Sequence, residues 1–430
     1  MNRVLLIAFH YPPCSGSSGL LRSLKFSRYL PEFGWQPIVL TVRPSTYAAT
    51  DSASADLIPE GVPVLRSFAF DIKKAFAFAG FYPDCLAIPD RWGSWLLGAL
   101  PSGVRAIREN RADIIFSTFP ISTAVLVGFF LHLLTGKPWV ADFRDSMTEE
   151  CYPRERWRRS LWRWTERQAV RHASRLIFTA ASTRAMYLER YPDLSPEKCL
   201  LIPNGYDEED FHHIIGHQTL TAAKDRPLRL LHTGIIYPEE RDPRPFFRAL
   251  SLLKREGKIG AESVRIIFRA AGSEDLYRKI VGELDIADLI ELLPHVPYRQ
   301  ALQECADADG LLLFQAANCD HQIPAKTYEY LRLQKPIFAL TSHTGDTAAL
   351  LRKVSGATIV NLADQNDIHR DFPLFLNALR TQTHAIADAR KIAFYARRNQ
   401  AGELAKCLSE LAKQAHSASA EKTQALHVEG

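Results

Sequence analysis

A short segment near residue 330 holds the residue types best suited to binding a phosphorylated ligand. It reads Ile323-Pro-Ala-Lys-Thr-Tyr-Glu-Tyr-Leu331 and follows an apolar run, 310–314, that predicts a buried strand. Pro324 suits the first position of a helix, because its missing N–H is one of the unpaired groups at a helix start. The free N–H groups and the positive dipole end of this helix would point out of the sheet beside Lys326, an arrangement that binds phosphate.

Glu329 lies three residues after Lys326, on the same helical face and one turn deeper. A carboxylate at this place can accept two hydrogen bonds from a vicinal diol such as a ribose. The spacing predicts a nucleotide-sugar pocket, with the lysine for the diphosphate, the glutamate for the ribose, and Pro324 and Thr327 beside them. The alternative interpretation is an ordinary ion pair on a surface helix.

Two glycine-containing loops predict further backbone approach to a ligand. The first, Pro12-Pro-Cys-Ser-Gly16-Ser-Ser-Gly19-Leu-Leu-Arg22, leads from a first strand into a helix over 20–30. Its Gly-x-x-Gly spacing, with no acidic residue after the second strand, argues against an NAD enzyme. Gly16 and Gly19 are candidates for binding the donor, and tight packing of strand against helix without a ligand is the alternative.

The second loop follows a predicted strand over 228–232. Gly234 would admit a ligand close to the backbone, and Arg241 offers a planar fork for phosphate oxygens. The alternative is a solvated charge cluster formed with the neighbouring acids Glu239, Glu240 and Asp242.

Acid–base candidates follow other strands. Asp142 and Asp145 come directly after a predicted strand over 139–141, so they would lie at the carboxyl edge of a sheet, where open α/β folds place ligands. Asp145 is the stronger candidate for contacting an acceptor hydroxyl or supporting charge at the sugar, and helix capping is the alternative for both. His10, just past the first strand, is the third catalytic candidate.

An Asp-x-Asp sequence at Asp307 and Asp309 has the spacing with which some transferases hold a divalent ion. Here it ends a helical pattern over 300–306 immediately before a buried strand. We therefore expect no metal site.

Composition places the chain among globular proteins. Its 430 residues are too many for one typical core and predict two domains. Hydrophobic residues make up 47% and charged residues 23%, which excludes disorder for the bulk of the chain. The seven cysteines occur singly, which favours a reducing compartment and hence the cytoplasm. The first apolar run is too brief for a signal peptide.

Short apolar runs alternate with longer helical patterns, which predicts an α/β fold with two doubly wound parallel sheets. We expect domains over 1–205 and 206–389 with a hinge at Asn204-Gly205, a helix over 390–412, and a disordered tail over 413–430. The predicted strands are 4–9, 37–41, 113–117, 139–141, 176–179 and 199–202, followed by 228–232, 264–270, 290–292, 311–314, 336–340 and 357–360.

The segment 154–172 is dense in arginine and tryptophan, including Arg158, Arg159, Trp162 and Arg163. Such a helix can lie on an anionic membrane surface with its aromatic rings at the headgroup level. The alternative is that the tryptophans pack inward and the arginines are solvated. Nothing else in the chain resembles a nucleic-acid-binding module. The apolar stretch 121–134 is too short for a membrane span and predicts a buried helix.

Taken in order, these motifs resemble those of the GT-B glycosyltransferases of family 4, also called group 1. The resemblance spans nearly all of 1–412. It includes the Pro-Pro-x-x-Gly loop with Arg22, Ala141-Asp-Phe-Arg-Asp145, Ile202-Pro-Asn-Gly-Tyr-Asp207, Gly234 with Arg241-Asp-Pro-Arg244, and Ile323-Pro-Ala-Lys-Thr-Tyr-Glu-Tyr-Leu331.

The resemblance implies two Rossmann-like domains facing across a cleft, the first binding acceptor and the second binding donor, with a C-terminal helix crossing back to the first. It also implies that Arg241 and Lys326 bind the donor diphosphate and that Glu329 binds the ribose, without a metal or other cofactor. Many family members carry a Glu-x7-Glu pair, whereas His321 occupies the first glutamate position here.

The expected function is transfer of a sugar, with retention, from a nucleotide diphosphate sugar to a glycan or lipid-linked acceptor in cell-surface polysaccharide synthesis. We expect a cytoplasmic protein at the inner face of the membrane that binds no nucleic acid. Two alternatives stay open: a GT-B nucleotide-sugar epimerase, and a non-catalytic partner in polysaccharide assembly.

Overall fold

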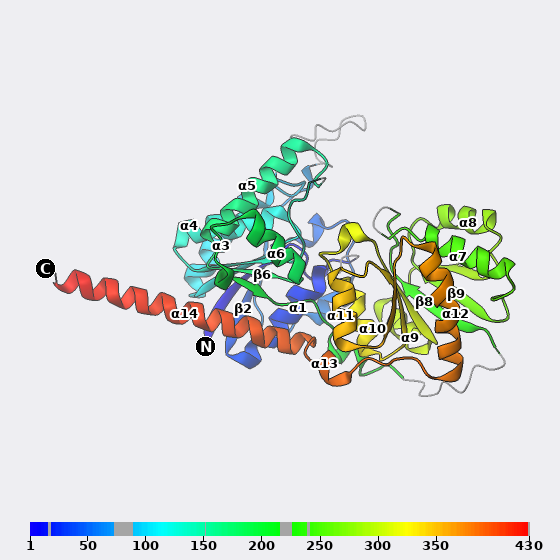
Figure 1. Ribbon diagram of the computed structural model, residues 1–430. Coiled ribbons are helices and arrows are strands. Elements are labelled where there is room, and N and C mark those ends of the chain that lie inside the picture. Colours follow the sequence, from blue (N-terminus) through cyan, green and yellow to red (C-terminus); the bar gives the residue numbers. More distant parts are fainter. Residues whose placement is uncertain (16–18, 73–88, 151, 216–225, 239–240, 429–430) are drawn as a thin grey trace, which may run out of the picture. The chain divides into compact units, whose positions relative to one another are not determined.

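The chain folds into two compact units in the computed structural model (Figure 1). Unit 1 comprises Met1–Pro203 with Arg397–Gly430, and unit 2 comprises Asn204–Ala396. The structure describes residues 1–15, 19–72, 89–150, 152–215, 226–238 and 241–428. Each unit is a parallel sheet between two layers of helices, which confirms the predicted α/β fold.

The sheet of unit 1 has seven parallel strands in the order β3-β2-β1-β4-β5-β6-β7. Its central strands are continuous apolar runs because helices cover both faces. The sequence did not predict β3, because this strand at the sheet edge is only half-buried and lacks such a run. The strands are β1 (Asn2–Ile7), β2 (Trp35–Val42), β3 (Val64–Ser67), β4 (Ile114–Thr118), β5 (Trp139–Phe143), β6 (Arg175–Phe178) and β7 (Cys199–Leu201).

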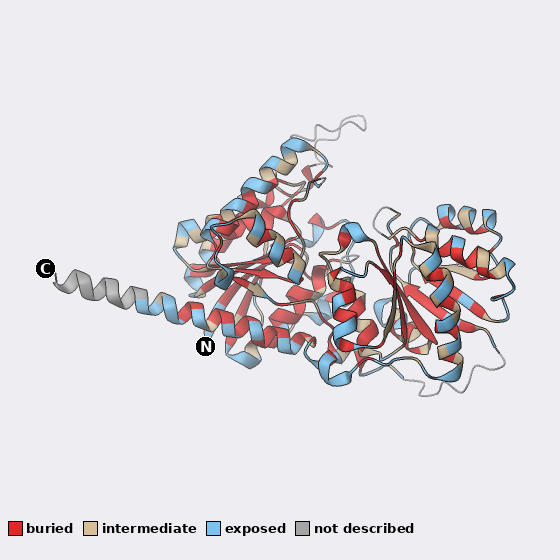
Figure 2. Ribbon diagram, viewed as in Figure 1, coloured by how far each residue is buried: buried red, intermediate tan, exposed pale blue. Residues whose placement is uncertain are grey.

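Two hydrophobic clusters flank this sheet. One face packs against α1 (Gly19–Tyr29) and α14 (Arg397–Val428). The other packs against α3 (Trp95–Glu109), α4 (Ser122–Thr135), α5 (Arg156–His172) and α6 (Ala181–Arg190). Figure 2 shows the buried residues gathered between the helices and the sheet. No helix in the described part of the chain has the length and apolarity needed to cross a bilayer.

The C-terminal helix differs from the prediction. The segment expected to be one helix over 390–412 is divided into α13 (Ala389–Ala393) and α14, and α14 continues to Val428 through the expected disordered tail (Figure 1). Leu404, Leu408 and Leu411 are buried, so packing supports the first half of α14. Its second half contains several alanines and neither glycine nor proline before Gly430, so intrinsic helix propensity favours continuation.

The sheet of unit 2 has six parallel strands in the order β10-β9-β8-β11-β12-β13. They are β8 (Leu228–Thr233), β9 (Val264–Arg269), β10 (Ile290–Leu293), β11 (Gly310–Gln315), β12 (Ile337–Thr341) and β13 (Ala357–Val360). The helices α7 (Arg244–Arg255), α8 (Glu274–Glu283) and α12 (Gln365–Thr381) cover one face. The other face packs against α9 (Tyr298–Asp307), α10 (Ala325–Arg332), α11 (Asp346–Val354) and α13.

A buried ion pair joins several elements of unit 1. The Arg22 guanidinium on α1 donates through Nε and Nη2 to the two carboxylate oxygens of Asp142, at 3.0 and 2.8 Å. Thr118 at the end of β4 donates to the same carboxylate at 2.8 Å. Arg22 also donates to the carbonyls of Ile202 and Pro203, each at 3.0 Å. The pair therefore holds together α1, the ends of β4 and β5, and the chain after β7.

We predict that Arg22→Met destabilises the protein by about 3–5 kcal/mol, because it leaves the buried Asp142 carboxylate without its counter-charge. Urea unfolding of the two proteins measures this difference. A matched control is Arg105→Met, which breaks an exposed pair with Glu109 and should cost less than about 1 kcal/mol. Equal losses in the two variants would contradict a special role for Arg22.

Candidate functional site

The strand order identifies one edge in each unit where a ligand can bind. The order reverses between β1 and β4 in unit 1 and between β8 and β11 in unit 2. At such a point the loops leave toward opposite faces of the sheet, and ligands bind outside the carboxyl ends of the strands. In unit 2 this edge brings Gly234, after β8, close to the start of α10, after β11.

Lys326 is the central charge of this edge. Its Nζ lies 3.2 Å from Nε2 of His232 and also donates to the Thr233 carbonyl. His232 Nδ1 lies 2.8 Å from the Leu312 carbonyl, which can only accept, so Nδ1 carries the proton and Nε2 accepts from the lysine. Both hydrogen bonds of the ammonium thus end on neutral atoms.

Burial shifts both titrating groups toward their neutral forms. Burial and, secondly, the Arg241 charge lower the pKa of Lys326 to about 7, although Glu329 opposes the shift. Burial and the Lys326 charge hold the pKa of His232 well below its usual value. A half-buried cation without an anion in hydrogen-bond contact can be stabilised by an anionic ligand.

The geometry of Gly234 fits a ligand approaching this lysine. Its φ of +94° is one that residues with a Cβ rarely adopt, and a Cβ there would lie 3.1 Å from Lys326 Nζ. Arg241 donates to the Ile235 carbonyl at 3.0 Å and lies over the Tyr237 ring. Asp242 pairs with Arg244, so its charge is balanced there, while Glu239 and Glu240 lie outside the described residues.

Glu329 is oriented by a residue that the sequence did not single out. Its Oε1 accepts a hydrogen bond of 2.7 Å from the hydroxyl of Tyr298, the first residue of α9. Tyr330, on the buried side of α10, accepts from the Thr233 N–H at 3.0 Å and fixes the helix to the end of β8. Burial raises the pKa of Tyr330, so its hydroxyl stays protonated.

The structure places Pro324 and Thr327, two predicted donor-binding residues, differently from the prediction. Pro324 is the residue before the helix, with φ −56° and ψ 134°, rather than the first helical residue, because its own carbonyl caps the Thr327 N–H at 3.0 Å. Thr327 is completely buried, and its hydroxyl has no hydrogen-bond partner among the described residues. Thr327 therefore supports the helix from the inside and does not face a ligand.

The loop after β11 and its neighbours form a second polar group at the same edge. His321 lies in this loop, with its Nε2 3.4 Å from Nε2 of Gln322. The adjacent Asp320 accepts the Asp346 N–H through its carbonyl at 2.8 Å, and its Oδ1 is buried without a hydrogen-bond partner in the described structure. The sequence reasoning had not singled out Asp320, although it stands beside His321.

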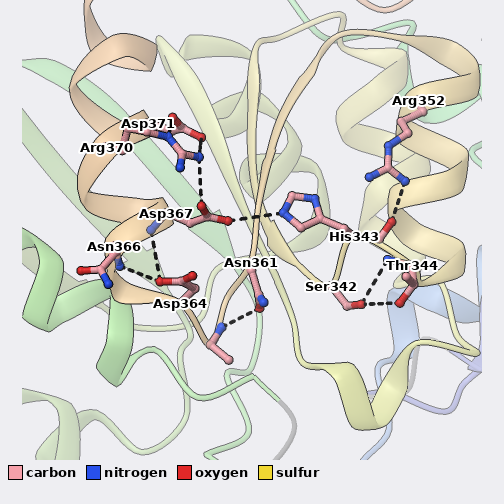
Figure 3. Close-up of polar contacts among 11 residues, drawn as sticks. Ser342, His343, Thr344, Arg352, Asn361, Asp364, Asn366, Asp367, Arg370 and Asp371 are labelled. Atoms are coloured by element: carbon pink, nitrogen blue, oxygen red, sulfur yellow. Dashed lines mark hydrogen bonds and ion pairs between the residues drawn. The ribbon is translucent and has the colours of Figure 1, made fainter.

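Figure 3 shows how the next loop is held. His343, after β12, points at Asp367 on α12 with an Nε2–Oδ2 separation of 3.4 Å, and Asp367 also pairs with Arg370 at 2.9 Å. Arg352 donates to the His343 carbonyl at 2.6 Å. These polar groups satisfy one another, so the cluster is an anchor for the loop and not a ligand site.

The Asp-x-Asp sequence lies at the amino end of β11, opposite the carboxyl edge where the ligand candidates lie. Asp309 directly precedes β11 and is therefore at its amino end. Arg226 binds its two carboxylate oxygens at 2.7 and 2.8 Å, and the Arg229 N–H donates at 2.7 Å. Its oxygens are thus occupied by protein donors.

In unit 1 the candidates near the carboxyl edge have different surroundings. Asp142 is 1% exposed and fully used by Arg22 and Thr118, so it is a structural anchor and not an acid facing a ligand. Asp145 is half-buried and interacts electrostatically with Arg144. Burial and the Arg144 charge lower the pKa of His10 to about 4, so its ring is neutral near pH 7.

Arg144 is the functional candidate of unit 1 that sequence reasoning overlooked. Its Nη1 donates to the Gly19 carbonyl at 2.8 Å, while its buried Nε has no hydrogen-bond partner within the described ranges. The signal was available, since Arg144 stands between Asp142 and Asp145 after β5. Gly16 lies outside the described residues.

The residues predicted to contact a membrane differ in burial and in their partners on α5. Trp162 is buried and donates to the Pro89 carbonyl at 2.6 Å. Arg158 pairs with Glu155 at 3.2 Å, and Arg159 donates to the Pro153 carbonyl at 2.9 Å. Arg163 is exposed. Trp162 therefore belongs to the core, and a different set of residues forms the outer face of this helix.

Comparison with known proteins identifies relatives of this chain. Residues 21–205 match the family model of the glycosyl transferase 4-like domain. A search of curated proteins gave no match.

Several solved structures share the whole fold. Sucrose-phosphate synthase from Thermosynechococcus elongatus has 15% identity and a TM-score of 0.60, over 97% of this chain and 100% of that one. Anabaena HepE, solved with UDP and glucose, has 15% identity and a TM-score of 0.58, over 98% and 100%. A protein described as a UDP-N-acetylglucosamine 2-epimerase from Listeria monocytogenes has 10% identity and a TM-score of 0.56, over 94% of both chains.

We predict that Lys326→Met stabilises the protein most below pH 7. The unfolded lysine has its ordinary pKa of 10.5 and binds a proton more readily than the folded one, so wild-type stability rises between pH 7 and 10.5. The methionine variant should be more stable by about 5 kcal/mol below pH 7. This advantage should vanish near pH 10.5.

Urea unfolding across this pH range measures the effect, and Lys279→Met on the exposed side of α8 is the control that should show none. A constant difference between Lys326→Met and wild type at all pH values would show that the ammonium is not under electrostatic stress.

Proposed function

Because the chain belongs to the group 1 glycosyltransferases and is a transferase with the GT-B fold, we propose that it moves a sugar, with retention, from a nucleotide diphosphate sugar to a hydroxyl of a glycan or lipid-linked acceptor. The reaction would serve the synthesis of a cell-surface polysaccharide. Unit 2 would bind the donor, and the carboxyl edge of unit 1 would bind the acceptor.

The observation that carries this proposal is the half-buried Lys326 ammonium, whose hydrogen bonds end on neutral atoms. A diphosphate supplies the missing negative charge, and Arg241 adds a second cation close enough to depress the lysine pKa. The free N–H groups at the start of α10 and the positive end of its dipole would also favour the diphosphate. Gly234 leaves room beside Nζ for a phosphate oxygen.

The ribose would bind one turn further along α10. Glu329 offers carboxylate oxygens to the two ribose hydroxyls, and Tyr298 keeps that carboxylate in position through its 2.7 Å hydrogen bond. HepE, a neighbour in fold, was solved with UDP and glucose, which supports a uridine nucleotide as the first donor to test.

Catalysis would rest mainly on positioning and on stabilising the departing diphosphate. Charge accumulates on the diphosphate as the glycosidic bond breaks, and Lys326, Arg241 and the helix end are placed to balance it. Asp145 would contact the acceptor hydroxyl. His10 would exchange hydrogen bonds there in its neutral form, because its pKa is lowered to about 4.

The cell would hold this enzyme in the cytoplasm, at the inner face of the membrane. The described cysteines Cys14, Cys199, Cys305, Cys319 and Cys407 are buried and form no disulfide bond, which suits a reducing compartment. Binding at the membrane surface would bring the active site to a lipid-linked acceptor.

One alternative has a specific observation in its favour. The fold neighbour from Listeria monocytogenes is described as a nucleotide-sugar epimerase, and such an enzyme would use the same donor pocket without an acceptor. His321, at the position of the usual first glutamate, is the feature that would suit a non-catalytic partner instead.

Incubating the protein with UDP-sugars, with and without cell-envelope glycan or glycolipid acceptors, tests the proposal, and mass spectrometry identifies the products. We expect a glycosylated acceptor and free UDP only when acceptor is present, and we expect EDTA to leave the rate unchanged. An isomerised sugar from donor alone would identify an epimerase. Activity that EDTA abolishes and manganese restores would overturn metal independence.

The two donor roles predict different responses to paired ligands. Glu329→Gln should weaken binding of uridine and UDP alike by about 1–3 kcal/mol, because it removes a charged acceptor from the ribose. Lys326→Ala should weaken UDP binding by a similar amount and leave uridine binding unchanged, because only UDP carries phosphates. Calorimetric titration measures all four affinities. An equal loss for both ligands in Lys326→Ala would contradict its assignment to the diphosphate.

A further inference from the structure

The helix α5 has two sides of opposite character. Its inward residues, Trp162, Thr165, Glu166, Ala169 and Val170, are buried against the sheet and neighbouring helices. Exposed residues recur along the rest of the helix (Figure 2). We define the basic face of α5 as the exposed residues Arg156, Trp157, Arg163, Trp164, Arg167 and Arg171.

The arginines of the basic face form one row. Arg156, Arg163, Arg167 and Arg171 are separated by seven, four and four residues, which places them on the same side of the helix. In the described structure none of their side chains makes an ion pair or a hydrogen bond. A row of aligned, unpaired cations costs repulsion in the isolated protein, and an anionic partner relieves it.

No acidic residue of α5 offsets this row. Glu166 is the one glutamate in the helix and is completely buried. Its carboxylate is used inside the protein by Arg190 at 2.8 Å, Tyr191 at 2.6 Å and Tyr187 at 2.9 Å. The sequence of α4, which packs against α5, contains no aspartate or glutamate. The positive potential of the basic face therefore stays uncompensated by these two helices.

Tryptophans and leucines add an apolar component beside the arginines. Trp157 is 38% exposed and Trp164 is 41% exposed, seven residues apart. Trp164 also meets Phe129 of α4 edge-on, with ring centroids 6.4 Å apart, and α4 ends with exposed Leu133 and Leu134. Amphipathic rings next to arginines match the headgroup level of a membrane, where one part of the ring is apolar and the other wet.

We propose that the basic face of α5 docks unit 1 on an anionic lipid bilayer, a refinement that rests on the proposed function because a lipid-linked acceptor would then lie at the same surface. The arginines bind anionic headgroups, and the two tryptophans insert between them. The occupant is a bilayer and not a nucleic acid, because the exposed rings and the leucines at the end of α4 offer apolar area that a phosphate backbone does not use. Arg158, Arg159 and Trp162, engaged inside the protein, are not part of the contact.

Cosedimentation with vesicles tests the proposal. The full chain should bind vesicles of phosphatidylglycerol and phosphatidylcholine, bind pure phosphatidylcholine weakly, and lose affinity as salt rises, because exposed charges are screened. Replacing Arg163, Arg167 and Arg171 with glutamine should weaken binding to the anionic vesicles by about a hundredfold, at about fivefold for each basic residue near the surface.

A charge-matched control removes the same number of arginines from unit 2. Arg248→Gln, Arg265→Gln and Arg278→Gln together should leave vesicle binding unchanged, because these exposed residues lie on other elements. Equal losses in the two triple variants would reduce the effect to net charge and would overturn the basic face as the docking site. Equal binding by wild type and the α5 variant would overturn it as well.

A second variant tests the apolar part of the contact. Trp157→Ser with Trp164→Ser keeps every arginine and should lower binding to anionic vesicles severalfold, most visibly at high salt, where the charges contribute least. Unchanged binding at high salt would remove the tryptophans from the contact. Binding of duplex DNA as tight as that of anionic vesicles would identify a general polyanion surface and overturn the lipid assignment.

Two further measurements separate this inference from the proposed function. UDP affinity and thermal unfolding should be the same in wild type and in the α5 triple variant, because Arg241, Lys326 and Glu329 lie in unit 2. A protein that binds UDP but no vesicles would refute the docking surface alone. One that binds vesicles through α5 but transfers no sugar would refute the proposed function alone.

Discussion

The half-buried Lys326 ammonium, held against the end of β8 at the start of α10, constrains the proposed donor region of unit 2. The hydrogen bonds of this ammonium come from a neutral histidine and from a backbone carbonyl. A glycine at 234 suits this arrangement, because a Cβ there would lie 3.1 Å from Nζ. Tyr330 then fixes α10 to β8, so that the lysine cannot withdraw toward solvent without breaking the packing beneath it.

Arg22 and Lys326 are two cations of this protein with different surroundings. Arg22 is surrounded by acceptors that match it: both oxygens of one carboxylate and two carbonyls. Lys326 has no carboxylate in hydrogen-bond contact, and burial together with the Arg241 charge lowers its pKa to about 7. Folding alone would favour an apolar residue at 326, so the cost of keeping the lysine there makes sense when a ligand supplies the anion.

The same reasoning separates the arginines around α5. Those at 158 and 159 bind a glutamate and a carbonyl near the start of the helix and contribute to its local structure. The side chains of Arg156, Arg163, Arg167 and Arg171 have no such partners in the described structure. Neutral residues at these exposed positions would cost the helix little stability. Both groups are arginines of the same segment of sequence, and only the direction of each side chain distinguishes them.

The sequence by itself determined the architecture and the donor motif. Continuous apolar runs and intervening helical patterns gave the parallel sheets, because strands covered on both faces must be apolar, and the Lys326–Glu329 spacing is local to one helix. The half-buried edge strand β3 and the extent of α14 escaped prediction, because neither is marked by an apolar run.

Only the tertiary structure decided which polar residues form buried ion pairs inside the protein. Asp142 and Asp145 are equivalent in sequence, yet Arg22, distant along the chain, occupies the first and leaves the second half-buried. The contacts of His232, Tyr298 and Arg144 are made between elements that meet only in the folded structure. Trp162 packs inward and is therefore not at the surface, where the sequence had placed it. Partners separated by many residues in the chain leave no local pattern, because the contact between them is created by the fold.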